Sequence, residues 1–132
     1  MGNDAYFPLL KDKIPSEKAL EKSWKPIVDD MDDFFKRTKI PILFTEYGYM
    51  NLEGCAYNTW ELEVKRSETA MNELAQASAL KALLNTFKEK AWWKGGFLWK
   101  WFPNMQGHEG CLDKDYTPQE KKAFEILKNH YN

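Results

Sequence analysis

Hydrophobic positions divide the chain into short strand-like segments and longer helix-like ones. Residues 40–44 are apolar around one proline and too few for a helix, so they predict a strand buried on both faces, as in a parallel sheet covered by helices. Residues 4–6 and 97–101 predict two further strands. A stretch with helical spacing of apolar residues follows each strand. The pattern therefore predicts an α/β fold of three βα units.

Three helices are expected. Ser16 is a suitable N-cap for a helix that ends near residue 37, and Pro26 should kink or split it. A second helix is predicted over residues 67–91, ended by the glycine pair at 95–96. Residues 117–120, Thr-Pro-Gln-Glu, have the capping signature of a third helix. The buried stripe of the second helix is expected to contain Met71, Leu74, Ala77, Leu80, Leu84 and Phe87.

Long loops are predicted after the second and third strands, over residues 50–65 and 102–116. Parallel strands joined by right-handed crossovers point the same way, so both loops should lie at the carboxyl end of the sheet, where α/β folds place their chemistry. Glu46 ends the central strand and is the candidate catalytic residue. The alternative is a solvated loop acid or one that pairs with a nearby lysine.

The unusual feature of the composition is its high aromatic content, 15% of the chain. The 132 residues, expected to form a single domain over 1–132, include 6 Trp, 6 Tyr and 8 Phe. Trp and Tyr are the side chains that stack on sugar rings, since they combine a flat apolar face with a polar edge. The 19 basic and 20 acidic residues nearly cancel, so nucleic acid and anionic membranes are not expected as partners. No apolar run approaches the length of a membrane span.

The sequence leaves the cell compartment open. Its first residues, Met-Gly-Asn-Asp, are polar and acidic and lack the apolar region of a signal peptide. A complete chain would be expected in the cytoplasm, and a piece of a secreted enzyme outside the cell or in the periplasm. Cys55 and Cys111 fall in predicted loops, where two free thiols are the default and a disulfide stays open. No His, Cys and Asp cluster has ligand spacing, so neither metal nor cofactor is expected.

Four motifs follow one another along the chain: DAYFPL from residue 4, LFTEYGY from residue 43, GFLWKW from residue 96 and DYTPQ from residue 115. In this order and at this spacing they resemble the C-terminal part of glycoside hydrolase family 113. These are retaining β-mannanases with a (βα)8 TIM barrel of clan A type. The resemblance covers nearly the whole chain, and it implies that the three strands are the sixth, seventh and eighth of a partial barrel.

The resemblance also implies catalytic roles. Glu46 is similar in position to the family's nucleophile, and Tyr6 matches an aromatic hydroxyl that orients this carboxylate. A retaining glycosidase needs such a carboxylate roughly 5–5.5 Å from a second carboxyl group, which acts first as acid and then as base. A tyrosine hydroxyl that donates to the nucleophile keeps it ionised and aimed. The alternative for Tyr6 is a phenol of the core.

Further residues are implied to bind the sugar. Trp99 matches the indole beneath the sugar next to the scissile bond, and Trp101 either extends that platform or packs outward. The alternative for both is barrel packing. Tyr49 and His108 are further candidates for sugar contact, and His108 alternatively is a solvated loop residue.

The chain departs from the family in one respect. The acid/base glutamate of this clan ends the fourth strand within an Asn-Glu pair, and no such segment is present. Loop acids lie on the expected face, but no motif assigns them the role. These loop acids are Glu53, Glu61, Glu109, Asp113 and Asp115.

Three hypotheses follow. The chain is part of a mannan-degrading enzyme that needs an N-terminal half, or a binding module for β-linked mannan that does not hydrolyse it, or a half-barrel that self-associates. Sheet edges open on both sides, and apolar groups facing the barrel interior, invite another chain. Those groups are expected to be Phe97 or Leu98, Trp99 and Phe44. We therefore expect a homo-oligomer or pairing with an N-terminal half-barrel.

Overall fold

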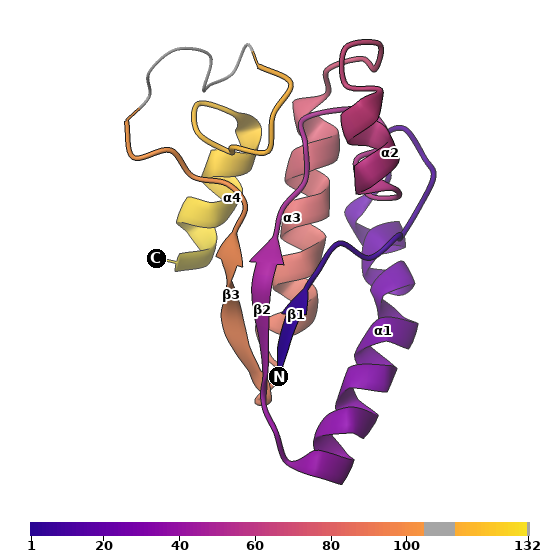
Figure 1. Cartoon of the computed structure of the whole chain (residues 1–132), viewed down its shortest axis with the longest axis vertical. Helices are drawn as coiled ribbons and strands as arrows, with labels where there is room; N and C mark the ends of the chain where they lie inside the picture. Colours follow the sequence, from indigo (N-terminus) through magenta and orange to yellow (C-terminus); the bar gives the residue numbers. More distant parts are fainter. Residues whose placement is uncertain (105–112, 132) are drawn as a thin grey trace.

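The computed structural model describes residues 1–104 and 113–131. Strands alternate with helices along the chain, with one short extra helix (Figure 1). The elements are β1 (Gly2–Asp4), α1 (Glu17–Thr38), β2 (Ile42–Tyr47), α2 (Thr59–Val64), α3 (Glu73–Phe87), β3 (Trp93–Leu98) and α4 (Lys122–Tyr131).

The strands form one sheet in the order β1-β2-β3, and both pairs are parallel. Asn3 of β1 pairs with Phe44 of β2, and Ile42 of β2 pairs with Trp93 of β3. The register shifts once between β1 and β2 and twice along β2 in its pairing with β3. Helix α3 lies behind the sheet, with α1 and α4 on its two sides (Figure 1). The prediction of three parallel βα units is confirmed.

Capping residues bound helix α1 at both ends. The Ser16 side chain accepts a hydrogen bond from the Ala19 N–H, and Lys39 ends the helix with a left-handed backbone, φ 59°, and an N–H that bonds to the Phe35 carbonyl. The predicted N-cap is confirmed. Pro26 does not split the helix, because buried Trp24 and its apolar neighbours on the same face hold both halves against the core.

The third strand lies earlier in the sequence than predicted. It covers Trp93–Leu98 instead of 97–101, so the glycine pair at 95–96 lies inside the strand and does not end a helix. A Cβ atom on Gly96 would lie 2.7 Å from the Cβ of Phe44, closer than two non-bonded carbon atoms can approach. Glycine thus permits a close approach of β3 to β2 that no other residue would allow.

The second predicted helix was placed too early. Asn72 caps α3 by accepting from the Ala75 N–H, so the helix starts at Glu73 and not at residue 67. Met71 therefore precedes the helix and Leu74 lies in its first turn, and both are exposed, at 39% and 54%. These two predicted core positions were wrong, and α2 occupies part of the predicted 50–65 loop.

The last helix starts later than its capping signature predicted. The Thr117 hydroxyl donates to the Gln119 side chain at 2.9 Å and accepts from the Gln119 N–H at 3.2 Å. Glu120 has a left-handed backbone with φ 58°, which no helical residue adopts. Residues 117–120 consequently form a turn, and α4 begins at Lys122.

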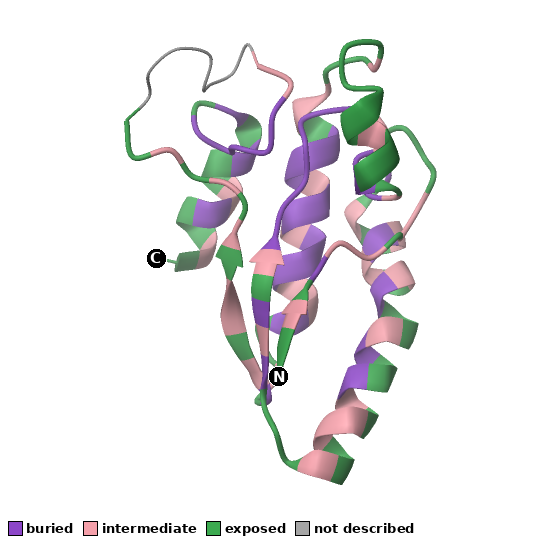
Figure 2. Cartoon of the chain, viewed as in Figure 1, coloured by how far each residue is buried: buried purple, intermediate pink, exposed green. Residues whose placement is uncertain are grey.

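An aromatic cluster at the centre joins the sheet to its helices. The Phe87 ring of α3 lies 4.8 Å from Phe44, 5.1 Å from Trp24, 6.0 Å from Trp92 and 5.8 Å from Trp93, between ring centroids. Phe44 is completely buried, so the expectation that it faces the uncovered side of the sheet was wrong. Buried positions concentrate on α3 and on the chain that follows β2 (Figure 2).

The packing of α3 predicts a contrast between two leucines of the same helix. Leu80 is completely buried, and Leu80→Ala should lower the free energy of unfolding by about 2–5 kcal/mol through lost burial and a cavity. Leu74 is 54% exposed, and Leu74→Ala should change it by less than about 0.5 kcal/mol. Urea denaturation followed by circular dichroism measures both. Equal losses would contradict the burial pattern of α3.

Candidate active site

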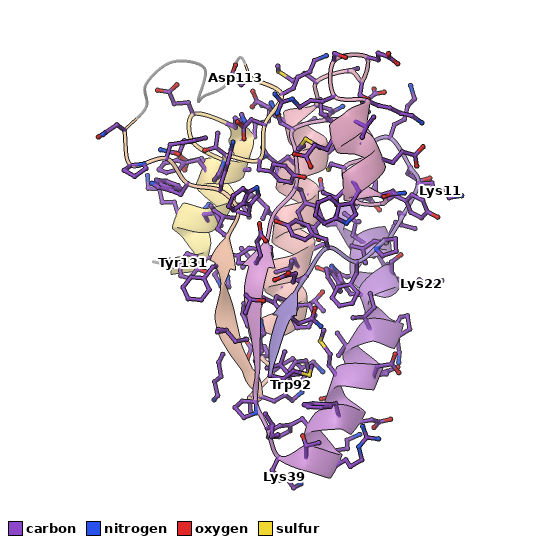
Figure 3. The ribbon with its side chains drawn as sticks, in the orientation of Figure 1. Lys11, Lys22, Lys39, Trp92, Asp113 and Tyr131 are labelled. Carbon is purple, nitrogen blue, oxygen red and sulfur yellow. The ribbon has the colours of Figure 1, made fainter. Side chains whose placement is uncertain are left out.

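The carboxyl ends of the three strands bring the predicted catalytic residues to one end of the sheet. Backbone pairing continues past the strands: the Ala5 N–H donates to the Glu46 carbonyl at 2.7 Å, and the Trp99 N–H donates to the Tyr47 carbonyl at 2.7 Å. Tyr6 follows the first of these bonds directly. Asp113 lies at the same end of the molecule, whereas Lys39 and Trp92 lie at the opposite end (Figure 3).

Glu46 and Tyr6 are in contact. The Tyr6 hydroxyl donates a hydrogen bond to the Glu46 carboxylate. The pKa of Tyr6 is raised above its ordinary value, first by burial and then by this hydrogen bond and the negative charge of Glu46. Both side chains are only partly buried. The pair thus combines a carboxylate open to a ligand with a phenol that stays protonated and able to donate.

A second phenol, that of Tyr116, stands beside the first. Its ring lies 6.4 Å from that of Tyr6, nearly edge-on. The pKa of Tyr116 is raised by burial, then by the charges of Glu63 and Glu46. Sequence reasoning missed both Tyr116 and Glu63 as neighbours of the site, and the only signal for Tyr116 was its place in the DYTPQ motif.

Two buried amides hold Tyr116 in place. The Asn51 side chain donates to the Asp113 carbonyl at 2.8 Å and accepts from the Asp115 N–H at 2.7 Å. The Gln76 amide nitrogen donates to the carbonyl of Tyr116 at 3.0 Å. Both amides are completely buried, so the chain over 113–117 is tied to the segment after β2 and to α3. Sequence reasoning missed these positioning residues too, since an isolated amide in an apolar segment does not reveal its partner.

The Trp99 and Trp101 side chains lie in different surroundings. Trp99 is 47% exposed, and the peptide bond that follows it is cis. Its carbonyl oxygen lies so close to Gly48 that a Cβ there would be 1.9 Å away, so only glycine fits at residue 48. Trp101 packs against Phe124 of α4, with 6.1 Å between ring centroids. Trp101 is 48% exposed, so both indoles are open to solvent, Trp99 directly after β3 and Trp101 against α4.

Other predicted contacts are not at the surface of this site. Tyr49 is buried at 3% exposure, its hydroxyl has no hydrogen-bond partner among the described residues, and burial raises its pKa, so its predicted contact with a sugar was wrong for this fold. Cys55 is a free buried thiol, and burial raises its pKa to about 12. His108, Glu109 and Cys111 lie outside the described residues.

Of the four predicted loop acids within the described residues, all but Asp113 are paired with lysines. Glu53, Glu61 and Asp115 form ion pairs of 2.9, 2.6 and 3.3 Å. Asp115 is buried and also accepts from the Thr117 N–H, which makes it part of the loop structure. Among residues 1–104 and 113–131, no group of three or more His, Cys, Asp or Glu side chains could hold a metal ion.

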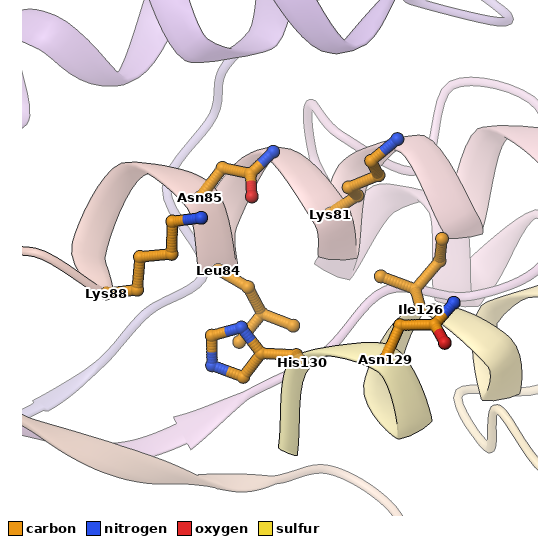
Figure 4. A pocket seen from close by; sticks show the side chains of 7 residues that line it. All are labelled: Lys81, Leu84, Asn85, Lys88, Ile126, Asn129 and His130. Atoms are coloured by element: carbon orange, nitrogen blue, oxygen red, sulfur yellow. The ribbon is translucent and has the colours of Figure 1, made fainter. Parts of the chain in front are cut away.

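The helical surface contains a separate hollow of about 390 Å³ between α3 and α4 (Figure 4). Lys81, Lys88 and His130 are among its lining residues, and burial followed by the Lys88 charge lowers the pKa of His130. The hollow contains no residue of the strand ends. The candidate chemistry therefore lies with Glu46 and not in this groove. No helix in the described part of the chain is long and apolar enough to cross a membrane.

The contact between Tyr6 and Glu46 predicts a coupled titration. Glu46→Gln removes a negative charge that disfavours the phenolate, so the pKa of Tyr6 should fall towards its ordinary value of about 10. It should stay above that value because burial, the first cause, remains. NMR of isotope-labelled tyrosine across the alkaline range measures this, with Tyr6→Phe to assign the signal. Glu61→Gln serves as the matched control, and an equal shift in both variants would contradict the pairing.

Comparison with known proteins assigns the chain to a family. The model of Glycoside Hydrolase Family 113 matches residues 1–121. No curated protein sequence is significantly similar to the chain. A GH113 β-1,4-mannanase in a complex has a TM-score of 0.76 and 22% identity over 98% of this chain and 38% of its own. A further GH113 β-1,4-mannanase structure has a TM-score of 0.74 and 21% identity, with 98% and 38% covered. The β-mannanase AaManA from Alicyclobacillus acidocaldarius in complex with ManMIm has a TM-score of 0.72 and 20% identity over 98% of this chain and 37% of its own.

At these identities the solved structures show the fold. The three parallel βα units are part of a (βα)8 barrel, as the motif resemblance implied, and the chain spans 38% of the length of the first two mannanases. The family model, in contrast, covers 121 of the 132 residues and includes the Tyr6, Glu46 and Trp99 positions. The chain belongs to glycoside hydrolase family 113.

Proposed function

We propose that the chain supplies the nucleophile side of a retaining glycoside hydrolase that acts on β-linked mannan-type polysaccharide. The observation that carries this proposal is the hydrogen bond from the Tyr6 hydroxyl to the Glu46 carboxylate at the carboxyl end of a parallel sheet. The family membership and the β-mannanase structures of the same fold support the substrate class.

In the proposed mechanism Glu46 attacks the anomeric carbon and forms a glycosyl-enzyme intermediate, which water then hydrolyses. The hydrogen bond from the Tyr6 hydroxyl orients the Glu46 carboxylate for this attack. The exposed indole of Trp99 offers an apolar face to the sugar ring, and its electron-rich surface favours the developing positive charge.

The mechanism needs a second carboxyl group, and the described acids of this chain do not supply an evident one. Glu53, Glu61 and Asp115 are held in ion pairs with lysines. Glu63 lies near Tyr116 and is exposed to solvent on α2. We infer that the acid/base residue comes from βα units outside this sequence, since the chain spans 38% of the related mannanases.

A prediction about catalysis follows. The chain alone should not hydrolyse β-mannan measurably, because losing the acid/base removes about 10²–10⁴-fold of rate enhancement. An aryl mannoside with an activated leaving group needs no protonation and should show slow turnover that Glu46→Gln abolishes. Adding a polypeptide with the missing βα units should restore cleavage of mannan. Glu61→Gln is the control.

The opposite result would be informative. Robust cleavage of unactivated mannan by the isolated chain, lost in Glu46→Gln, would contradict the need for a second polypeptide and would place the acid/base within these 132 residues. Binding of mannan without turnover of any substrate, even with the added units, would instead support the non-catalytic binding module.

A second proposal concerns assembly. Strands β1 and β3 are the outer strands of the sheet, and their free edges present backbone N–H and C=O groups that can pair with another chain. The face of the sheet opposite α3 exposes Phe97 at 66% and Trp99 at 47%. We propose that a second copy, or a half-barrel from another polypeptide, covers this face.

The assembly proposal predicts a measurable mass. Light scattering at micromolar concentration should give a dimer or larger species, and Phe97→Lys should shift it towards the monomer because the charge cannot be buried at an interface. Val64→Lys places the same charge on α2 at a residue that is 86% exposed, and it should leave the mass unchanged. A well-folded wild-type monomer would contradict the proposal.

A further inference from the structure

We propose that Trp60 of α2 forms a second sugar-binding platform, on the opposite side of Glu46 from Trp99. The ligand would be a β-linked oligosaccharide long enough to run across the ends of all three strands. This inference rests on the proposed function, which it extends from one sugar site to a cleft with contacts on both sides of the nucleophile.

The first observation is the exposure and position of Trp60. Its side chain is 70% exposed, far more than is usual for an indole in a folded protein. Its ring is 6.3 Å from the ring of Tyr6, tilted by 58°. Tyr6 in turn donates to Glu46. Trp60 is therefore linked to the proposed nucleophile through a single side chain, that of Tyr6.

The second observation is that α2, the helix that carries Trp60, is anchored to the rest of the chain. Asn58 caps the helix by accepting from the Glu61 N–H, and the Leu62 side chain packs into a small apolar cluster. That cluster consists of buried Met50, Leu52 and Tyr116, with Tyr6 packed against it. An aromatic side chain presented by a fixed element loses little conformational entropy when a ligand stacks on it.

The third observation is the order of the strands. Tyr6, which Trp60 contacts, follows β1, and Trp99 follows β3. The strand order therefore puts the two exposed indoles on either side of β2 and Glu46. Neighbouring strands lie about 4.8 Å apart, which separates the outer strands of this sheet by roughly 10 Å. This distance exceeds one sugar ring. A ligand that contacts both indoles must therefore contain several linked sugars, as expected for attack within a polysaccharide.

The polar groups around Trp60 favour a carbohydrate over an apolar partner. Trp60 contacts Tyr6, and the Tyr116 ring and the Glu46 carboxylate lie next to Tyr6, so the site offers groups that can bond to sugar hydroxyls. Trp101 instead packs on Phe124 in a groove next to α4 that Tyr47, Lys128 and Tyr131 also line. Of these two exposed indoles, Trp60 is the one that contacts the pair of Tyr6 and Glu46 and can extend a sugar site there.

The test is calorimetric titration of the full chain with β-1,4-linked manno-oligosaccharides of increasing length. Affinity should rise with length, and Trp60→Ala should weaken binding of the long oligosaccharides by about 3- to 10-fold, the effect expected of one aromatic stacking contact. Binding of mannobiose should stay unchanged. Trp60→Phe should keep part of the affinity because it retains an aromatic face. Val64→Ala, an exposed position on the same helix, should have no effect.

The other outcomes separate this inference from the proposed function. Equal binding by wild type and Trp60→Ala at every length would overturn the second platform, while weaker binding by Trp99→Ala would still support the proposed site. No binding of any oligosaccharide by the wild-type chain would overturn both. A change in solution mass in Trp60→Ala without loss of affinity would assign this indole to an interface between chains and would also overturn the inference.

Discussion

The site depends on parallel backbone pairing that continues beyond the strands themselves. Bonds of 2.7 Å from Ala5 to Glu46 and from Trp99 to Tyr47 bring three distant segments to one level at the end of the sheet. The approach is close enough that Gly48 and Gly96 leave no room for a side chain. This main-chain pairing brings Tyr6 to the level of Glu46, and the cluster of Met50, Leu52 and Tyr116 packs against Tyr6.

The loops are then fastened by buried polar groups. Asn51 and Gln76 bond to backbone groups of the 113–117 segment, and an unpaired buried amide would cost more than the bond itself contributes. This segment places Tyr116 beside Tyr6, and α2 packs on the same small cluster. The surroundings of Glu46 are thus built from two loops whose positions depend on each other.

One face of the sheet is anchored by the aromatic cluster around Phe87, and the opposite face is left with exposed Phe97 and Trp99. In a (βα)8 barrel the strands form a closed inner ring and the helices surround it. Three βα units alone therefore have helices on one face of the sheet and none on the face that would line the barrel interior. In the proposed function, the open face and the second carboxyl group have one explanation, because a partner that supplies further βα units would bring both the cover and the acid/base.

The sequence by itself determined the order of elements, the parallel arrangement and the residues Tyr6, Glu46 and Trp99 as strand-end groups, because short apolar runs and local motifs depend on nearby residues alone. Tertiary structure decided what local patterns could not. The turn at residues 117–120 overrode a strong capping signature, Gly96 became part of a strand because Phe44 lies against it, and Tyr49 was buried. The approach of Trp60 and Tyr116 to Tyr6 likewise depends on contacts between segments far apart in the chain, which no local pattern records.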